Sequence, residues 1–263
     1  MFLPIHAAGR YVQGRSVLGE CLSDVVVSSY IPTVNALLKT TSAESNSVKK
    51  YGDACNGLLI VSQPNTPGQS PIPCAADETN KVLRQLEKVG ISTHALDDKE
   101  GTVDGVLKAM ESYSCIHFAC HASQNVASPL KSSIYLHDGQ LELSEIMKRN
   151  LVHSDFAFLS ACQTSMGDEN LPEEVVHIAA GMLAAGYRSV VGTMWSIFDK
   201  HGPDLAEFFY ENLLDGEKNG KRRKIDGAGA ARALHYATKR LRDKVSDSPD
   251  SLLAWVPYIH IGI

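Results

Sequence analysis

Blocks of apolar residues with two different periodicities follow one another along the chain and predict strands and helices in turn. Continuous apolar or β-branched runs predict strands at 24–32, 57–64, 91–97, 114–120, 155–161, 188–197 and 255–263, with two short strands around an Asp-Gly turn within 132–143. Apolar residues at helical spacing predict helices at 33–41, 74–90, 102–113, 143–150, 173–186, 201–216 and 226–245. Gly90 is expected to end a helix and Ser144 to cap one.

This alternation of strands and helices predicts an α/β fold with a mostly parallel central sheet covered by helices on both faces. The pattern contains no convincing internal boundary, so residues 1–263 are expected to form a single domain with a sizeable core. The chain starts inside an apolar segment, MFLPIHAAGRY, whereas a natural domain edge is usually more polar. We therefore expect it to be a C-terminal fragment of a longer protein.

Composition and charge narrow the class of protein. Hydrophobic residues make up 44% and charged residues 21% of the chain, which is typical of a soluble globular protein. The net charge of −5 argues against a general attraction to nucleic acid, and the basic block at 217–226 is interpreted as a solvated loop. The sequence shows neither a signal peptide nor an apolar run of bilayer length, so we expect a cytoplasmic protein without membrane association.

The six cysteines show neither CxxC nor zinc-ligand spacing, and no metal or other cofactor is expected. A nucleotide-binding protein is poorly supported, because neither GxGxxG nor GxxxxGK[ST] follows any predicted strand. Cys115 and Cys120 lie in an apolar run, where a reduced thiol behaves as a small hydrophobic side chain.

Two apolar runs end in reactive residues. The run SCIHFAC is followed by His121, and the run DFAFLSA is followed by Cys162. In an open parallel sheet, ligands bind beyond the carboxyl ends of the strands, so the two side chains are expected to meet at one edge. An imidazole there can hold a thiolate or accept its proton and later protonate a leaving amine. The backbone amides of Cys162 and of a turn at 121–123, including Ala122, are candidate donors to an oxyanion.

The alternative interpretation is structural, since a single Cys or His on an apolar strand is most often a core residue. His117 and His260 also lie on apolar strands and are interpreted in that way. The position of His121 and Cys162 at the ends of two strands of one predicted sheet distinguishes them from the other histidines and cysteines.

The segments IHFACHA and AFLSACQT together resemble the His and Cys motifs of CHAT domains, which are caspase-like domains of the cysteine-peptidase clan that includes separases, metacaspases and gingipains. The resemblance extends to LPIHAAGRY, SSIYLHDGQLELSEI, HIAAGMLAAGYRSVVGTMWSI and SLLAWVPYIHIGI, and is weakest from about 40 to 112. It implies a caspase-like three-layer sandwich, often preceded by tetratricopeptide repeats. The sequence of the motifs is similar to that in fungal multidomain proteins.

The resemblance places the general base on His121 and the nucleophile on Cys162, and it implies a cysteine endopeptidase acting on protein or peptide substrates. The residue after the His is commonly Gly in this clan and is Ala122 here, which adds a methyl group and restricts φ at that position. An upstream repeat or sensor region is expected to regulate such a site.

Two further features bear on the substrate. The segment 191–196, with Met194 and Trp195, is expected to pair with an extended substrate, as the corresponding strand does in caspase relatives. Asp168 and Glu169 follow the cysteine closely and favour a basic residue before the cleaved bond, although a solvated loop is the more frequent explanation of such charges. The competing hypothesis is a catalytically silent interaction or effector module, because fold does not determine function.

Overall fold

The computed structural model describes residues 3–12, 15–33, 57–125, 127–149, 151–162, 175–195, 197, 199–215, 225–245 and 251–262, and for Leu18, Ala161, Cys162 and 175–177 it describes the backbone alone. Most of the predicted helix at 33–41 and most of the basic block at 217–226 lie outside these residues.

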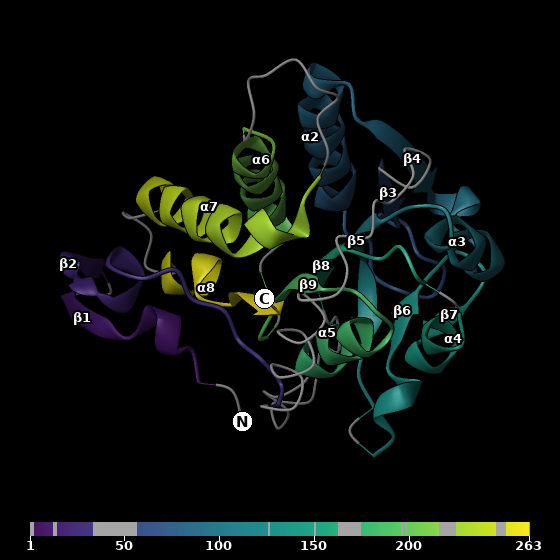
Figure 1. Ribbon diagram of the computed structural model, residues 1–263, viewed down its shortest axis with the longest axis horizontal. Coiled ribbons are helices and arrows are strands. Elements are labelled where there is room, and N and C mark those ends of the chain that lie inside the picture. Colours follow the sequence, from purple (N-terminus) through teal and green to yellow (C-terminus); the bar gives the residue numbers. More distant parts are fainter. Residues whose placement is uncertain are drawn as a thin grey trace.

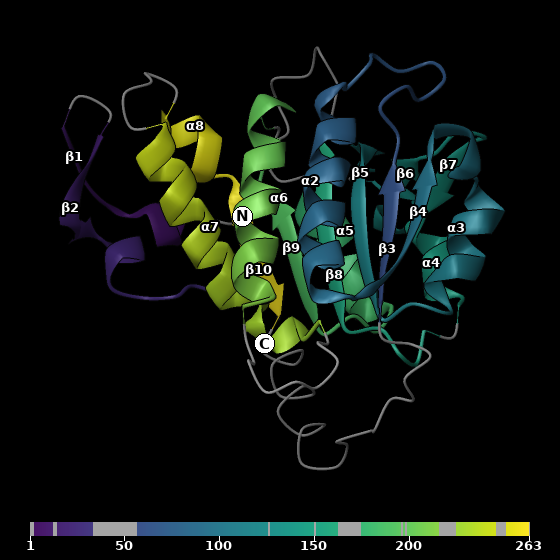
Figure 2. The ribbon, with the colours of Figure 1, turned by 90° about the horizontal axis from the view of Figure 1, so that it is seen from above.

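A twisted sheet forms the centre of the molecule, with strand order β10-β9-β8-β5-β3-β4. These strands are β3 (Gly57–Ser62), β4 (Ser92–Asp97), β5 (Cys115–Ser123), β8 (Phe156–Cys162), β9 (Ser189–Thr193) and β10 (Tyr258–Gly262). All pair in parallel except β10, which runs antiparallel to β9 at one edge. Figure 2 shows this order from β10 to β4 across the sheet. The prediction of a mostly parallel sheet is therefore confirmed.

Helices cover both faces of the sheet (Figure 1). One face carries α2 (Cys74–Val89), α6 (Gly202–Leu213), α7 (Ala230–Lys244) and α8 (Ser251–Trp255), and the other carries α3 (Val103–Met110), α4 (Leu143–Met147) and α5 (Val175–Ala184). Short 3-10 turns lie at Ile5–Ala7, Leu22–Asp24, Asp98–Glu100, Pro129–Lys131, Asp199–His201 and Gly227–Gly229. Gly90 ends α2 in the left-handed conformation with φ of 69°, as predicted.

Each face of the sheet has its own apolar core. Successive residues of a strand point to opposite faces, so Ile116 and Phe118 pack on the α3–α5 side while Cys115 packs on the α2–α6 side. All six residues of β3 are buried, which explains why its sequence is continuously apolar rather than alternating. Each fully buried Leu or Ile side chain in such a layer contributes about 1.5–3 kcal/mol through removal of apolar surface from water.

A hairpin beyond the end of β5 adds two short strands, β6 (Ser133–Tyr135) and β7 (Gln140–Glu142). The predicted pair of strands around the Asp-Gly turn is confirmed. The following helix, α4, has Glu142 rather than Ser144 at its N-cap position, and the Ser144 hydroxyl donates to the Glu142 carboxylate instead. The cap prediction was wrong because the N-cap position lies two residues earlier than expected, so that Ser144 falls inside the first turn.

Residues 3–12 and 15–33 belong to an N-terminal arm that packs beside α7, α8 and β10 (Figure 1). It contains the antiparallel strands β1 (Gly9–Val12) and β2 (Arg15–Cys21), which the sequence pattern did not predict. The guanidinium of Arg242 on α7 donates to Asp24 at 2.6 Å, and both side chains are less than 10% exposed. This buried ion pair attaches the arm to the domain.

The predicted strand at 24–32 was wrong. Tyr30 makes a single parallel bridge to Ile261, and the preceding residues have no strand structure. Val25 is 70% exposed, with Val26 and Val27 also exposed. β-branched residues favour strands only where a neighbouring strand and a packed face receive them, and the arm offers neither beyond Tyr30.

Candidate active site

His121 lies near the carboxyl end of β5. It is beside the point in the strand order where successive strands are added first to one side of β3 and then to the other. From β3 the chain passes to β4 on one side and then to β5 on the other, so β3 is flanked by both. Ligands of open α/β sheets bind at the carboxyl ends of strands around such a reversal. The sheet topology therefore puts His121 in a part of the fold that is suited to a site.

The backbone of Cys162 lies directly opposite that of His121. The parallel pairing of β5 with β8 runs from Cys115 opposite Phe156 to His121 opposite Cys162 without a shift of register. Neighbouring strands are about 4.8 Å apart, so this register makes the two residues nearest neighbours across the sheet. The pairing of β8 with β9 ends earlier, at Phe158 opposite Val191.

The ring of His121 is fully buried, and a backbone carbonyl orients it. Its Nε2 lies 2.7 Å from the carbonyl oxygen of Ser70, in the loop that follows β3. A carbonyl oxygen only accepts hydrogen bonds, so Nε2 carries a proton. In the neutral ring the lone pair then resides on Nδ1, which is the nitrogen able to act as a base.

Two loops meet over this end of the sheet on the α2–α6 face. Ile72 and Ala75 pack against Ala119 of β5. The amide of Cys74, at the start of α2, donates to the Asp199 carboxylate in the segment after β9, at 3.1 Å. The loop after β3 is therefore joined to the segment after β9, and the join explains the burial of His121 from that side.

The other described cysteines are poorly suited to act as nucleophiles. Cys115 and Cys120 are 0% exposed, and Cys21 is 2% exposed. Burial, together with the neighbouring Asp199 carboxylate, raises the pKa of Cys74 to about 11. Cys74 therefore stays protonated at neutral pH, and a protonated thiol is a weak nucleophile.

The predicted turn at 121–123 was wrong, because β5 continues through Ser123. Ala122 lies opposite Ile134 of β6 and is 6% exposed. The hairpin that holds β6 extends β5 beyond its partner strands, so these residues stay extended. The backbone of Ala122 is thus part of the sheet rather than of an open turn.

The predicted strand at 188–197 is shorter in the structure, since β9 ends at Thr193. Met194 is 3% exposed and donates its amide to the Pro257 carbonyl at 2.7 Å, so that amide is used within the fold. Trp195 packs against the cores of both faces, and within the described part of the chain its buried Nε1 has no hydrogen-bond acceptor. Asp168 and Glu169 lie outside the described residues.

Sequence reasoning missed Ser70 and Asp199. The pattern predicted a loop at the position of Ser70, but no local signal shows that a backbone carbonyl will face a histidine 51 residues further along. The contact between the Ser70 carbonyl and His121 depends on the strand order, in which β3 lies beside β5.

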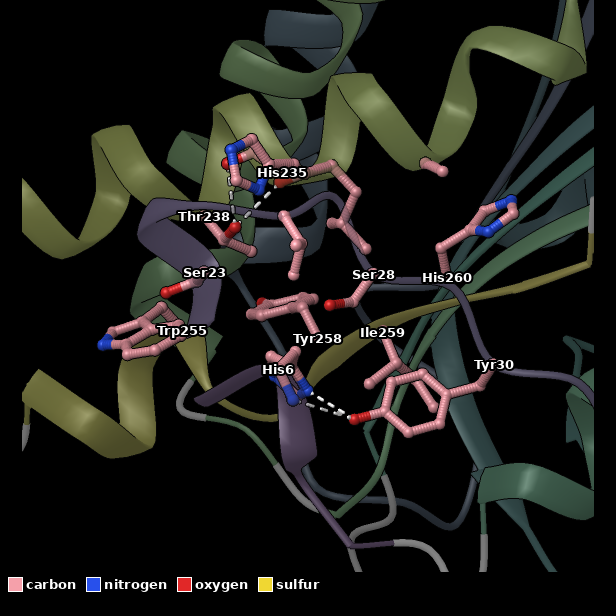
Figure 3. A pocket seen from close by; sticks show the side chains of 13 residues that line it. His6, Ser23, Ser28, Tyr30, His235, Thr238, Trp255, Tyr258, Ile259 and His260 are labelled. Atoms are coloured by element: carbon pink, nitrogen blue, oxygen red, sulfur yellow. Dashed lines mark hydrogen bonds between the residues drawn. The ribbon is translucent and has the colours of Figure 1, made fainter. Parts of the chain in front are cut away.

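A hollow lies elsewhere, between the N-terminal arm and α7, α8 and β10. It encloses about 370 Å³ including its open mouth, and His6, His235 and His260 are among its lining residues. Figure 3 shows the ring of His6 pointing toward the hydroxyl of Tyr30 within it. No Cys lines this hollow, and within the described ranges no group of three or more His, Cys, Asp or Glu side chains is arranged to hold a metal.

Among the described residues, no helix has the length and apolarity needed to cross a membrane.

Comparison with known proteins identifies the fold and family. Residues 2–263 match the model of the CHAT domain family. Comparison with curated proteins found no match. The structure is similar to the Arg-specific cysteine proteinase gingipain R (RgpB) of Porphyromonas gingivalis, with a TM-score of 0.51 and 12% identity over 78% of this chain and 46% of that chain.

It is also similar to the separase of Saccharomyces cerevisiae in its complex with securin, with a TM-score of 0.56 and 14% identity over 92% of this chain and 14% of the separase chain. The chain thus spans less than half of gingipain R and a small part of separase. At these identities the similarity shows a shared caspase-like fold.

Proposed function

Because the chain belongs to the CHAT domain family and has a caspase-like fold, we propose that it is a cysteine endopeptidase with Cys162 as nucleophile and His121 as general base. The observation that carries this proposal is the register of β5 and β8, in which the two residues are direct cross-strand neighbours at the carboxyl edge of the sheet. The hydrogen bond from His121 Nε2 to Ser70 adds support, because it fixes the tautomer in which Nδ1 carries the lone pair that a general base needs.

The reaction follows from these groups. His121 Nδ1 accepts the thiol proton as the sulfur of Cys162 attacks the carbonyl carbon of a peptide bond. The tetrahedral intermediate collapses, the carbon–nitrogen bond breaks, and the imidazolium returns the proton to the leaving amine. Water then hydrolyses the thioester and regenerates the thiol. The Ser70 carbonyl stabilises the imidazolium through its hydrogen bond to Nε2.

Backbone amides near the two residues are the proposed oxyanion donors, with the amide of Cys162 first and that of Ala122 second. An extended substrate is proposed to pass along the β8-facing side of the segment after Val191, where the pairing of β9 with β8 has ended. Trp195 is the proposed side-chain contact there, since its indole N–H is a buried donor without an acceptor in the described part of the molecule. We also propose that Asp168 and Glu169 favour a basic residue before the cut bond.

The test is cleavage of a peptide library by wild-type protein, Cys162→Ala and His121→Ala. We expect either substitution to lower kcat/KM by at least about 10³-fold, the scale on which loss of a nucleophile or its base acts. Cys74→Ala is the matched control, because it removes a partly exposed thiol at the rim of the same site. Cleavage that survives loss of either Cys162 or His121 would exclude this dyad.

A second candidate function has an observation in its favour. His121 is 0% exposed, which fits an interaction or effector module whose dyad never meets a substrate, or a peptidase that is active only after the joined loops separate. Selective labelling of Cys162 over the other five cysteines by a thiol-reactive peptide electrophile favours the peptidase. Uniform or absent labelling favours the module.

A further inference from the structure

A buried cluster of polar side chains lies beneath the candidate site on the α2–α6 face. Glu78 of α2 is 4% exposed and His117 of β5 is 0% exposed. Ser160 of β8 donates its hydroxyl to Glu78 Oε2 at 2.9 Å. His117 Nδ1 lies 3.2 Å from the hydroxyl of Tyr210 on α6.

Glu78 is the centre of this arrangement. Its Oε1 lies 3.0 Å from His117 Nε2, which is ion-pair distance, although the direction of the ring N–H falls outside hydrogen-bond geometry. The ring of His117 is held in place by stacking on Phe158, with centroids 4.8 Å apart. One carboxylate therefore contacts the two neighbouring strands that carry His121 and Cys162.

The surroundings are shaped to admit this carboxylate. A Cβ atom at Gly202, the first residue of α6, would lie 2.6 Å from Glu78 Oε2, so only glycine fits there without a shift. Acidic groups are favoured near a helix N-terminus, and α6 is 12 residues long. A buried carboxylate is costly unless it is paired, and four elements supply or accommodate its partners: α2, β5, β8 and α6.

The contacts of Glu78 lie about one helical turn from the site. Glu78 is four residues after Cys74, or about 6 Å along α2, and α2 follows directly from the loop that holds the Ser70 carbonyl. Ser160 precedes Cys162 by two residues, about 6–7 Å along β8. Glu78 thus connects the base of α2 to the strand of the proposed nucleophile.

We propose that Glu78 is a positioning residue: by reaching both His117 and Ser160, it sets α2 against β5 and β8 and so places the Ser70 carbonyl on His121 Nε2. The assignment of a role in activity rests on the proposed function, whereas the placement of the His121 ring does not. The length of the Glu78 side chain, rather than its charge, is the property that the geometry requires.

Three substitutions separate length from charge. Glu78→Gln keeps the length and can both accept from Ser160 and contact His117, so it should resemble the wild type. Glu78→Asp keeps the charge but is one methylene too short to reach both strands, and Glu78→Ala loses both contacts. Asp24→Asn is the matched control, because it weakens a buried ion pair in the distant arm.

The first measurement is the ¹⁵N NMR spectrum of the His121 ring in each folded variant, which reports the tautomer independently of catalysis. We expect the Nε2-protonated form to persist in Glu78→Gln and Asp24→Asn, and to give way to a mixture in Glu78→Asp and Glu78→Ala. A tautomer that is unchanged in all four variants would overturn the proposal, as would loss of the Nε2-protonated form in Asp24→Asn.

The second measurement is the rate at which iodoacetamide alkylates Cys162 as a function of pH, with the modified residue identified by mass spectrometry. At pH 7 we expect the alkylation rate of Cys162 to differ from that of the wild type by about tenfold or more in Glu78→Asp and Glu78→Ala. In Glu78→Gln and Asp24→Asn it should differ by less than about threefold. This rate can be measured whether or not Cys162 is a catalytic residue. Failure of the peptidase proposal would appear as cleavage insensitive to Cys162→Ala, with these results unaffected.

Discussion

Two buried histidines lie on the same central sheet, His121 on β5 and His260 on the edge strand β10, and their hydrogen bonds differ. His260 is 1% exposed, with Nδ1 at 2.7 Å from the Ser29 hydroxyl and Nε2 at 2.6 Å from the Ser189 hydroxyl. The Ser29 hydroxyl donates to the Gly262 carbonyl, so it accepts from His260, and Ser189 donates to the other ring nitrogen. Both nitrogens of the neutral ring are thereby used within the fold, one by the arm through Ser29 and the other by β9 through Ser189.

His121 has a different arrangement, with Nε2 on a carbonyl and its backbone opposite that of a cysteine. The comparison teaches that a hollow and a chemically suited pair of residues can lie in different parts of one fold. His260 lines the hollow beneath the arm, but its surroundings favour a neutral, structural imidazole. The carbonyl partner of His121 instead fixes one tautomer of the ring, with the proton on Nε2 and the lone pair on Nδ1.

The largest expected difference between the two histidines is in activity. His121→Gln retains a donor for Ser70 but removes the base, so kcat/KM should fall by about 10³-fold while the free energy of unfolding changes by less than about 1 kcal/mol. His260→Gln should leave kcat/KM within about threefold and lower the free energy of unfolding by about 2 kcal/mol, because the two serine contacts need the ring geometry.

Peptide cleavage assays and urea unfolding of both variants measure these effects. Activity that falls with His260→Gln as strongly as with His121→Gln would remove the distinction between the two sites.

Acid should destabilise the arm region. Burial lowers the pKa of His260 from 6.5 to about 4, so the unfolded chain takes up a proton near pH 6.5 that the folded chain resists until about pH 4. The stability contributed by the neutral ring is complete above pH 6.5 and is lost as the pH falls through 4, by about 3 kcal/mol for this one residue. Burial also lowers the pKa of His6 and His235, which adds loss in the same direction.

Urea unfolding of the wild type and of His260→Asn at a series of pH values tests this. The difference between the two pH dependences gives the contribution of the His260 ring. A wild-type pH dependence as shallow as that of His260→Asn would show that His260 does not contribute to it.

The smallest expected effect concerns the contact between the arm and β10. Ser29→Ala removes the hydroxyl that joins His260 to the Gly262 carbonyl, and it should lower the free energy of unfolding by about 1 kcal/mol without changing peptide cleavage. Ser28→Ala is the matched control, since Ser28 lines the hollow next to it, and should change stability by less than about 0.5 kcal/mol. Equal effects of the two substitutions would mean that the hydroxyl of Ser29 does not hold the arm.

Local pattern sufficed where one element's own residues decide its conformation. The buried run of β3 and the helical spacing of α2, which ends at Gly90, both predicted their elements closely. Local pattern failed at Val25, Val26 and Val27, whose β-branched side chains predicted a strand that has no partner. It also failed at Ala122, where pairing with β6 replaces a turn.

By itself the sequence determined the class of fold, the positions of most strands and helices, and the presence of an imidazole and a thiol at two strand ends, because periodicity and composition act along a few neighbouring residues. The tertiary structure alone decided that His121 and Cys162 are opposite each other, that the Ser70 carbonyl orients the ring, and that Glu78 contacts both strands. Those contacts join residues 39 to 82 positions apart, and strand order and helix packing, which depend on the whole chain, bring them together.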